Sequence, residues 1–221
     1  MGNQGDVPNF LLFFEYLSYV EEKMEIFFRI ALGIIYFSQV FLLLFFYRKT
    51  NDKKVLHDTA NETPIFVAIR TSWVVLVICS ILLHIFLPSL MEWSNVYLNT
   101  TLRSCGVIAG ILSNLLIFWV VHTLGENISA ALKVRDNQRL VANGPYRYVR
   151  HPLYVAGIPL FLSIFLISSN WFLGFIGVSF QLFIILVRTP IEEKMLLQHF
   201  GDEYQYYMNN TGAYFPKFKQ K

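Results

Sequence analysis

Residues 152–187 read PLYVAGIPLFLSIFLISSNWFLGFIGVSFQLFIILV, a run of 36 residues without a charged side chain. A membrane-spanning helix needs only about 20 predominantly apolar residues, so this run is too long for one span. Ser168, Ser169 and Asn170 interrupt it near the middle, and such a polar cluster is typical of a turn. The run therefore predicts two short helices joined by a tight turn, because local thinning of the bilayer can accommodate short helices.

Three further apolar stretches precede this hairpin, at about residues 26–47, 65–87 and 102–121. Each is long enough to cross the hydrocarbon of a bilayer. Over the 221 residues, 55% are hydrophobic and only 15% are charged, whereas soluble domains carry about 25% charge. The chain is therefore expected to be all-α, a multi-pass transmembrane helical bundle of about five spans. The apolar but short stretch 7–20 is expected to lie at the membrane interface.

The basic residues indicate how such a bundle is oriented. Five spans place three basic segments on one side of the membrane: the loop before residue 65, the stretch 122–150 and the tail after residue 187. Because basic loops stay in the cytoplasm, that side is predicted to be cytoplasmic, with the N-terminus outside or lumenal. The net charge of +3 is too small to suggest a nucleic-acid partner.

The first polar block with possible chemistry is QRLVANGPYRYVRHPLY, residues 138–154. Gly144 and Pro145 form a turn signal, and Pro152 is suited to the first turn of the helix that follows. His151 would then lie at a helix N-terminus, where backbone N–H groups attract anions. The alternative is an interfacial belt, because Tyr and Arg commonly anchor helix ends among lipid headgroups.

The second block is RTPIEEKMLLQHFGDEY, residues 188–204. Arg188 and Glu192 are four residues apart and therefore share one face of a helix. An ionisable residue at the end of a span usually faces a cavity or a partner and often marks function. The alternative is a self-satisfying Arg–Glu pair at a helix end. The run Tyr204, Tyr206 and Tyr207 is expected to be interfacial packing.

Together the two blocks, the hairpin between them and the closing TGAYFP of residues 211–216 resemble the isoprenylcysteine carboxyl methyltransferase family and its prokaryotic relatives. The resemblance covers about residues 102–216. Apolar length and this resemblance together predict three regions: an N-terminal interfacial segment (1–25), N-terminal transmembrane helices (26–101) and, from the resemblance, a methyltransferase catalytic region (102–221). The resemblance also implies a cofactor, S-adenosyl-L-methionine, in a pocket facing the cytoplasm, and no metal.

The resemblance also implies roles for individual residues. Arg188 would hold the carboxylate of the substrate, and Glu192 would contact the cofactor and assist catalysis. Lys133 is a weaker candidate for a cofactor contact. The remaining cofactor-binding residues that the resemblance implies are Gln138, Arg139, Leu140, Val141, Tyr146, His151, Pro152, Leu153 and Tyr154.

The expected reaction is methyl esterification of the C-terminal S-isoprenylcysteine carboxylate of a protein or small molecule that enters from lipid. A carboxylate needs no general base at neutral pH, since its reference pKa is near 4. The membrane would be the endoplasmic reticulum in a eukaryote or the plasma membrane in a prokaryote.

Three alternatives stay open. One is a methyltransferase for phospholipids or other small amphiphiles, in which an amine would need a base such as Glu192 or Glu193. The second is a sterol-reductase-like protein that uses a nicotinamide cofactor. The third is a non-catalytic membrane scaffold or lipid-binding protein.

Overall fold

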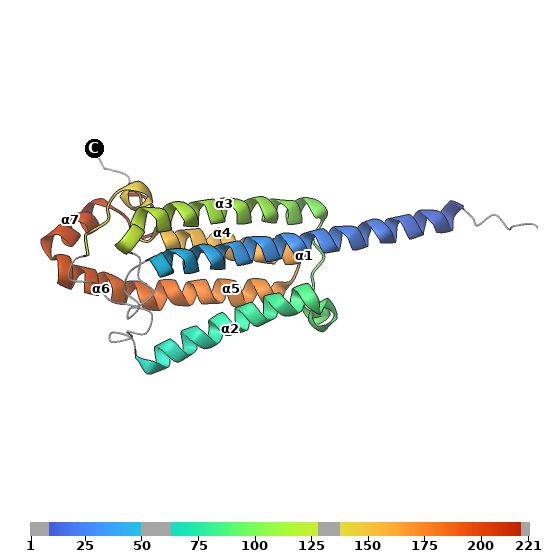
Figure 1. Cartoon of the computed structure of the whole chain (residues 1–221), viewed down its shortest axis with the longest axis horizontal. Helices are drawn as coiled ribbons and strands as arrows, with labels where there is room; N and C mark the ends of the chain where they lie inside the picture. Colours follow the sequence, from blue (N-terminus) through green and yellow to red (C-terminus); the bar gives the residue numbers. More distant parts are fainter. Residues whose placement is uncertain (1–8, 50–62, 128–137, 218–221) are drawn as a thin grey trace, which may run out of the picture.

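The computed structural model describes residues 9–49, 63–127 and 138–217, which are helical with short connections. Figure 1 shows α1, α3, α4 and α5 side by side, with α2 slanting away from them toward its N-terminal end. The elements are α1 (Asn9–Lys49), α2 (Pro64–Phe86), η1 (Pro88–Ser94), α3 (Thr100–Leu124), η2 (Gly125–Asn127), η3 (Gly144–Arg147), α4 (Pro152–Ser168), α5 (Trp171–Phe183), η4 (Ile184–Arg188), α6 (Thr189–Phe200) and α7 (Asp202–Asn210).

Membrane-crossing length is found in four of the described helical runs: Leu12–Phe46, Pro64–Phe86, Thr100–Leu124 and Trp171–Phe200. The fifth apolar helix, α4, is shorter. The expected all-α, multi-pass bundle of about five spans is therefore confirmed, and the protein is an integral membrane protein.

The predicted turn in the last apolar run is also confirmed, since α4 ends at Ser168 and α5 begins at Trp171. Asn170 caps α5 by accepting a hydrogen bond from the backbone N–H of residue 173 at 3.1 Å. Its amide nitrogen donates to the Ser94 hydroxyl at 2.7 Å and to the Met91 carbonyl at 3.1 Å. The turn is therefore fixed to η1, which connects α2 to α3.

The helix that holds the last apolar run continues past it. The apolar residues end at Val187, and the helix passes through a π-helical turn, η4, and continues as α6 to Phe200, which agrees with the expectation that Arg188 and Glu192 lie on one helix. Pro190 has no N–H to donate to the carbonyl four residues earlier, and a local π adjustment is one way in which membrane helices accommodate proline. Arg188, Glu192 and Glu193 are consequently carried by one helical run.

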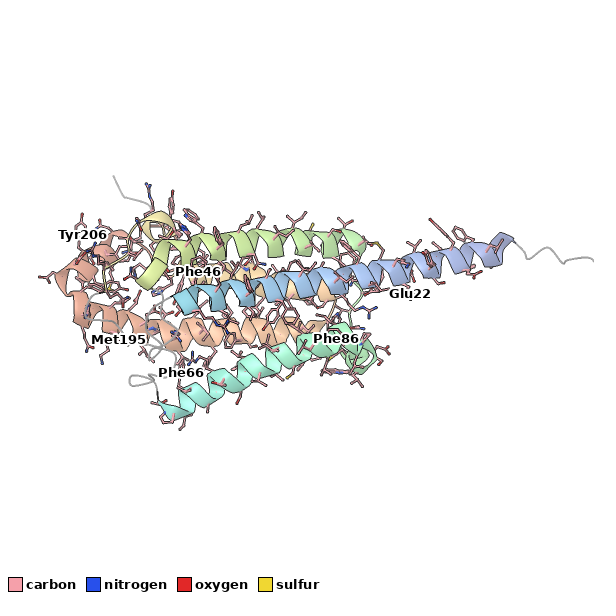
Figure 2. All side chains as sticks on the ribbon, in the orientation of Figure 1. Glu22, Phe46, Phe66, Phe86, Met195 and Tyr206 are labelled. Carbon is pink, nitrogen blue, oxygen red and sulfur yellow. The ribbon has the colours of Figure 1, made fainter. Side chains whose placement is uncertain are left out.

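At the other end of the chain, α1 is a single helix from Asn9 to Lys49. The described part of the expected segment 1–25 is therefore continuous with the first span. Its location at a membrane interface stays a prediction. Figure 1 shows this part of α1 extending past the other helices. In Figure 2, Glu22 lies on the extension, and Phe46 lies at the end of the bundle where Met195 is found.

A buried arginine ties α1 to α3 and α4 at the end near the hairpin turn. Arg103 on α3 is 6% exposed and donates to both carboxylate oxygens of Glu25 on α1. It also donates to the Ile167 carbonyl of α4 at 3.0 Å, and its guanidinium lies 4.1 Å from the centre of the Phe28 ring. A buried charge is tolerated only with such partners, so these contacts hold the three helices in register.

Candidate functional site

A cavity of about 570 Å³ opens at the opposite end of the bundle, where α3 ends and α4 begins. Small-molecule sites usually have volumes of about 300–1,000 Å³. All the long helices contribute to the walls, together with residues 138–141, η3 and α7. Two segments far apart in the sequence, 138–154 and 188–207, supply most of the polar groups.

The first of these segments is held in place by the chain that follows α7. The backbone N–H of Arg150 donates to the Gly212 carbonyl at 2.8 Å, and that of His151 donates to the Ala213 carbonyl at 3.1 Å. Val149 and Gly212 form an isolated parallel bridge. The closing TGAYFP motif therefore braces the segment that begins α4.

Glu193 on α6 connects the two polar segments through side chains. Its carboxylate accepts from Arg150 at 2.9 and 2.6 Å and lies 2.9 Å from Nε2 of His151. Arg150 also donates to the Thr211 and Met208 carbonyls. Charge-assisted hydrogen bonds of this kind are about twice as strong as neutral ones. This network fixes the His151 ring, which is 5% exposed and stacks against the Tyr154 ring.

Glu192, the next residue along α6, lies on the cavity wall. The Tyr154 hydroxyl donates to its carboxylate at 2.6 Å, and Arg188 acts electrostatically on the same hydroxyl. Arg188, Glu192 and Tyr154 all line the cavity. The site therefore combines a guanidinium, a carboxylate and a phenol at the end of an apolar helix hairpin.

Helices α4 and α5 pack closely against each other beside Arg188, Glu192 and Tyr154. Gln181 of α5 donates to the Tyr154 carbonyl at 2.6 Å. A Cβ at Gly157 would lie 2.5 Å from the Gln181 side-chain oxygen, so glycine leaves the space that the amide fills. This hydrogen bond ties α5 to the backbone of α4 at the cavity wall.

Two tyrosines of α7 complete the wall, and this corrects the expectation that they serve only as interfacial packing. Tyr204 and Tyr207 are buried and line the cavity, whereas Tyr206 is 73% exposed. Tyr207 donates from its hydroxyl to the Tyr146 carbonyl at 2.6 Å. Burial raises the pKa of both Tyr204 and Tyr207 well above the ordinary value, so both hydroxyls stay protonated at physiological pH.

Most of the residues singled out from the sequence come together at this cavity. Its lining includes Gln138, Arg139, Leu140, Val141, Tyr146, His151, Leu153, Tyr154, Arg188 and Glu192. Pro152 does not line it but is buried as the first residue of α4, while Lys133 lies outside the described residues.

Sequence reasoning missed Glu193 and Arg150 as a connected pair, because their separation of 43 residues carries no local signal. It also missed the contribution of the N-terminal helices, from which Gln39, Arg70 and Thr71 reach the cavity wall. A polar residue within an apolar span is a general signal for such a role.

Comparison with known proteins shows which family part of the chain resembles. Residues 106–198 match the model of the "Isoprenylcysteine carboxyl methyltransferase (ICMT) family", which confirms the resemblance seen in the sequence. The chain is 29% identical over 135 residues to a protein-S-isoprenylcysteine O-methyltransferase of Dictyostelium discoideum, covering 59% of this chain and 53% of that protein.

A second relative is a methanethiol S-methyltransferase of Pseudomonas deceptionensis. It is 33% identical over 76 residues, which cover 34% of this chain and 28% of that protein. The matches therefore span about half of the first relative and under a third of the second. The comparisons do not favour the phospholipid methyltransferase, reductase or scaffold interpretations.

The fold is also similar to a solved structure, that of the eukaryotic intramembrane Ras methyltransferase ICMT. The TM-score is 0.50, with 97% of this chain and 87% of that chain covered. Because the sequence identity is 22%, this likeness supports the membrane fold and not a particular activity.

Proposed function

We propose that this chain, which matches the model of the isoprenylcysteine carboxyl methyltransferase family over residues 106–198, is an S-adenosylmethionine-dependent membrane methyltransferase. Its acceptor would be the carboxylate of a C-terminal S-isoprenylcysteine. The observation that carries the proposal is the two-part character of the cavity. Arg188, Glu192 and His151 line its polar part, and Leu160 and Phe180 belong to an apolar part within the helices.

The polar part suits the cofactor. S-adenosylmethionine is a zwitterion with ribose hydroxyls and a flat base, so it needs donors, acceptors and apolar surface together. Gln138, Arg139 and Tyr146 supply donors, Glu192 supplies an acceptor, and Leu140, Val141 and Leu153 supply apolar surface. These residues, with His151 and Tyr154, would hold the cofactor, which when bound supplies an electrophilic methyl group.

Pro152 would contribute without lining the cavity. As the first residue of α4, it fits the start of a helix because its missing N–H would be unpaired there anyway. It thereby fixes the start of α4, with His151 directly before it and Leu153 directly after it. Its role would be to position these neighbours.

Arg188 would bind the acceptor carboxylate, because a guanidinium matches a carboxylate with two parallel hydrogen bonds. Tyr154 and Glu192 would fix the guanidinium on its other side. Holding two reactants in line can lower a barrier by about 7–11 kcal/mol. The acceptor needs no base, since a carboxylate is already ionised at neutral pH.

The apolar part would admit the isoprenoid chain from the lipid. It is formed between α1, α2, α4 and α5, and Figure 1 shows α2 diverging from the bundle toward the cavity end. A dry, apolar surrounding also strengthens the electrostatic contacts of the polar part. We place this end of the bundle at the cytoplasmic face, following the distribution of Lys and Arg.

The test is methyl transfer by the full-length protein in detergent, from labelled S-adenosylmethionine to N-acetyl-S-farnesylcysteine. The matched control acceptor is the same compound with its carboxylate replaced by a carboxamide. We expect a base-labile methyl ester on the acid and no product on the amide. Phosphatidylethanolamine and methanethiol should be poor acceptors.

Each alternative outcome identifies a different function. Methylation of phosphatidylethanolamine in place of the acid would make the protein a lipid N-methyltransferase. Preference for methanethiol would place it with its small-thiol relative. No S-adenosylhomocysteine binding by a folded protein, measured by calorimetry, would rule out a methyltransferase.

A further inference from the structure

The apolar part of the cavity is closed by an aromatic floor. Along α4 the lining residues end at Phe161, and along α5 they begin at Phe180. On α2 they stop at Val74, and on α3 the deepest is Ile117. Four helices thus reach the end of the cavity together, although each would be long enough to line a deeper one.

The two phenylalanines form this floor by contacting each other. Their ring centroids are 6.1 Å apart at an interplanar angle of 78°. This is the edge-to-face arrangement that aromatic pairs prefer. Trp73 supports Phe180 from α2, with ring centroids 6.3 Å apart. The Trp73 indole in turn donates to the Ile176 carbonyl of α5 at 3.2 Å, so side chains of three helices hold the floor.

Phe161 itself has little freedom to move aside. It is 8% exposed and packs against Gly177 of α5, where a Cβ would collide with its ring. Phe180 lies about 12 Å along the helix from Arg188, or two helical turns. The compartment between the polar groups and the floor therefore has a fixed, limited depth.

We propose that Phe161 is a specificity-determining residue that sets the length of the apolar chain of the acceptor. This inference rests on the proposed function, in which Arg188 binds the acceptor carboxylate and the chain lies in the apolar compartment. With the carboxylate fixed at one end, a chain too long for the compartment meets the Phe161 ring. Removing that ring opens the space above Gly177 and admits a longer chain.

The bundle offers a matched control one helical turn deeper. Phe165 lies on the same helix and packs on Gly174 of α5, where a Cβ would lie 2.8 Å from the Phe165 Cβ. Phe161 and Phe165 thus share residue type, helix and a glycine partner. Only Phe161 is among the residues that line the cavity.

The experiment compares Phe161→Ala, the milder Phe161→Leu and Phe165→Ala with the wild type. Each full-length protein is assayed with N-acetylcysteine carrying S-geranyl, S-farnesyl or S-geranylgeranyl chains, which differ by one isoprene unit. The readout is the ratio of kcat/KM for the longest chain to that for the shortest. Because both values come from one preparation, partial unfolding cancels from the ratio.

We expect Phe161→Ala to raise this ratio about tenfold or more, since even one extra or missing methylene in a hydrophobic pocket changes kcat/KM by about 10–200-fold. Phe161→Leu should raise it less, and Phe165→Ala should leave it unchanged. Equal ratios in the wild type and both Phe161 variants would overturn the inference and indicate that the chain leaves sideways into lipid. Methylation of none of the acceptors by the wild type would instead overturn the proposed function and, with it, this inference.

Discussion

The carboxylate of Glu193 lies 2.9 Å from Nε2 of His151, although the two residues are 42 positions apart in the chain. One belongs to the last long helical run and the other directly precedes α4. The same carboxylate binds Arg150, whose side chain is only 9% exposed. Glu193 therefore joins two walls of the cavity without being part of its lining.

Glu193→Gln tests this joining role. The substitution keeps the shape and an acceptor oxygen but removes the negative charge, so the buried Arg150 guanidinium loses its counter-charge and its hydrogen bonds become weaker. We expect a lower melting temperature in detergent and weaker S-adenosylhomocysteine binding. Glu203→Gln, at an exposed position of α7, is the control and should change neither. Unchanged affinity in Glu193→Gln would show that His151 does not depend on this carboxylate.

Arg188→Ala separates acceptor binding from cofactor binding. Without the guanidinium the acceptor carboxylate loses its charge-assisted hydrogen bonds, so kcat/KM for N-acetyl-S-farnesylcysteine should fall at least about a hundredfold. Affinity for S-adenosylhomocysteine should remain close to that of the wild type. Arg147→Ala, exposed and outside the cavity lining, should leave both values unchanged. If Arg188→Ala abolished S-adenosylhomocysteine binding, Arg188 would belong to the cofactor site.

His151→Ala and Tyr146→Phe test the cofactor part of the cavity. Both residues line it, and each substitution removes polar groups that we assign to the cofactor. We expect weaker S-adenosylhomocysteine binding by calorimetry, about 1–3 kcal/mol for a lost hydrogen bond. The controls are His199→Ala and Tyr148→Phe, which change the same residue types at exposed positions outside the lining. Equal affinities in test and control variants would contradict the assignment.

The sequence predicted the spans and the hairpin because apolar length and a polar turn are local signals. It also predicted that residues 138–154 and 188–192 meet, because a resemblance carries non-local information. It failed for Tyr204 and Tyr207, whose burial depends on how α7 folds back. It did not predict the π-turn itself, since a π-turn that keeps the helix continuous past Pro190 leaves no simple pattern.

The pH dependence of stability tests whether the Tyr207 hydroxyl is enclosed in the cavity wall. Burial raises the pKa of its hydroxyl above the ordinary value near 10, so the folded state keeps a proton that the unfolded chain loses. The resulting stability is fully present below pH about 10 and declines as the pH rises above that value. Tyr207→Phe removes this contribution together with the hydrogen bond to the Tyr146 carbonyl.

The measurement is thermal unfolding in detergent at pH 7.5 and at several values above 10, for the wild type, Tyr207→Phe and Tyr206→Phe. At pH 7.5 we expect Tyr207→Phe to be destabilised by about 1 kcal/mol through the lost hydrogen bond. Above pH 10 its melting temperature should fall less steeply than that of the wild type, because one buried phenol fewer ionises on unfolding. Tyr206→Phe, at an exposed position, should follow the wild type throughout. A difference between Tyr207→Phe and the wild type that did not change with pH would mean that the Tyr207 hydroxyl ionises normally and is not enclosed by the cavity wall.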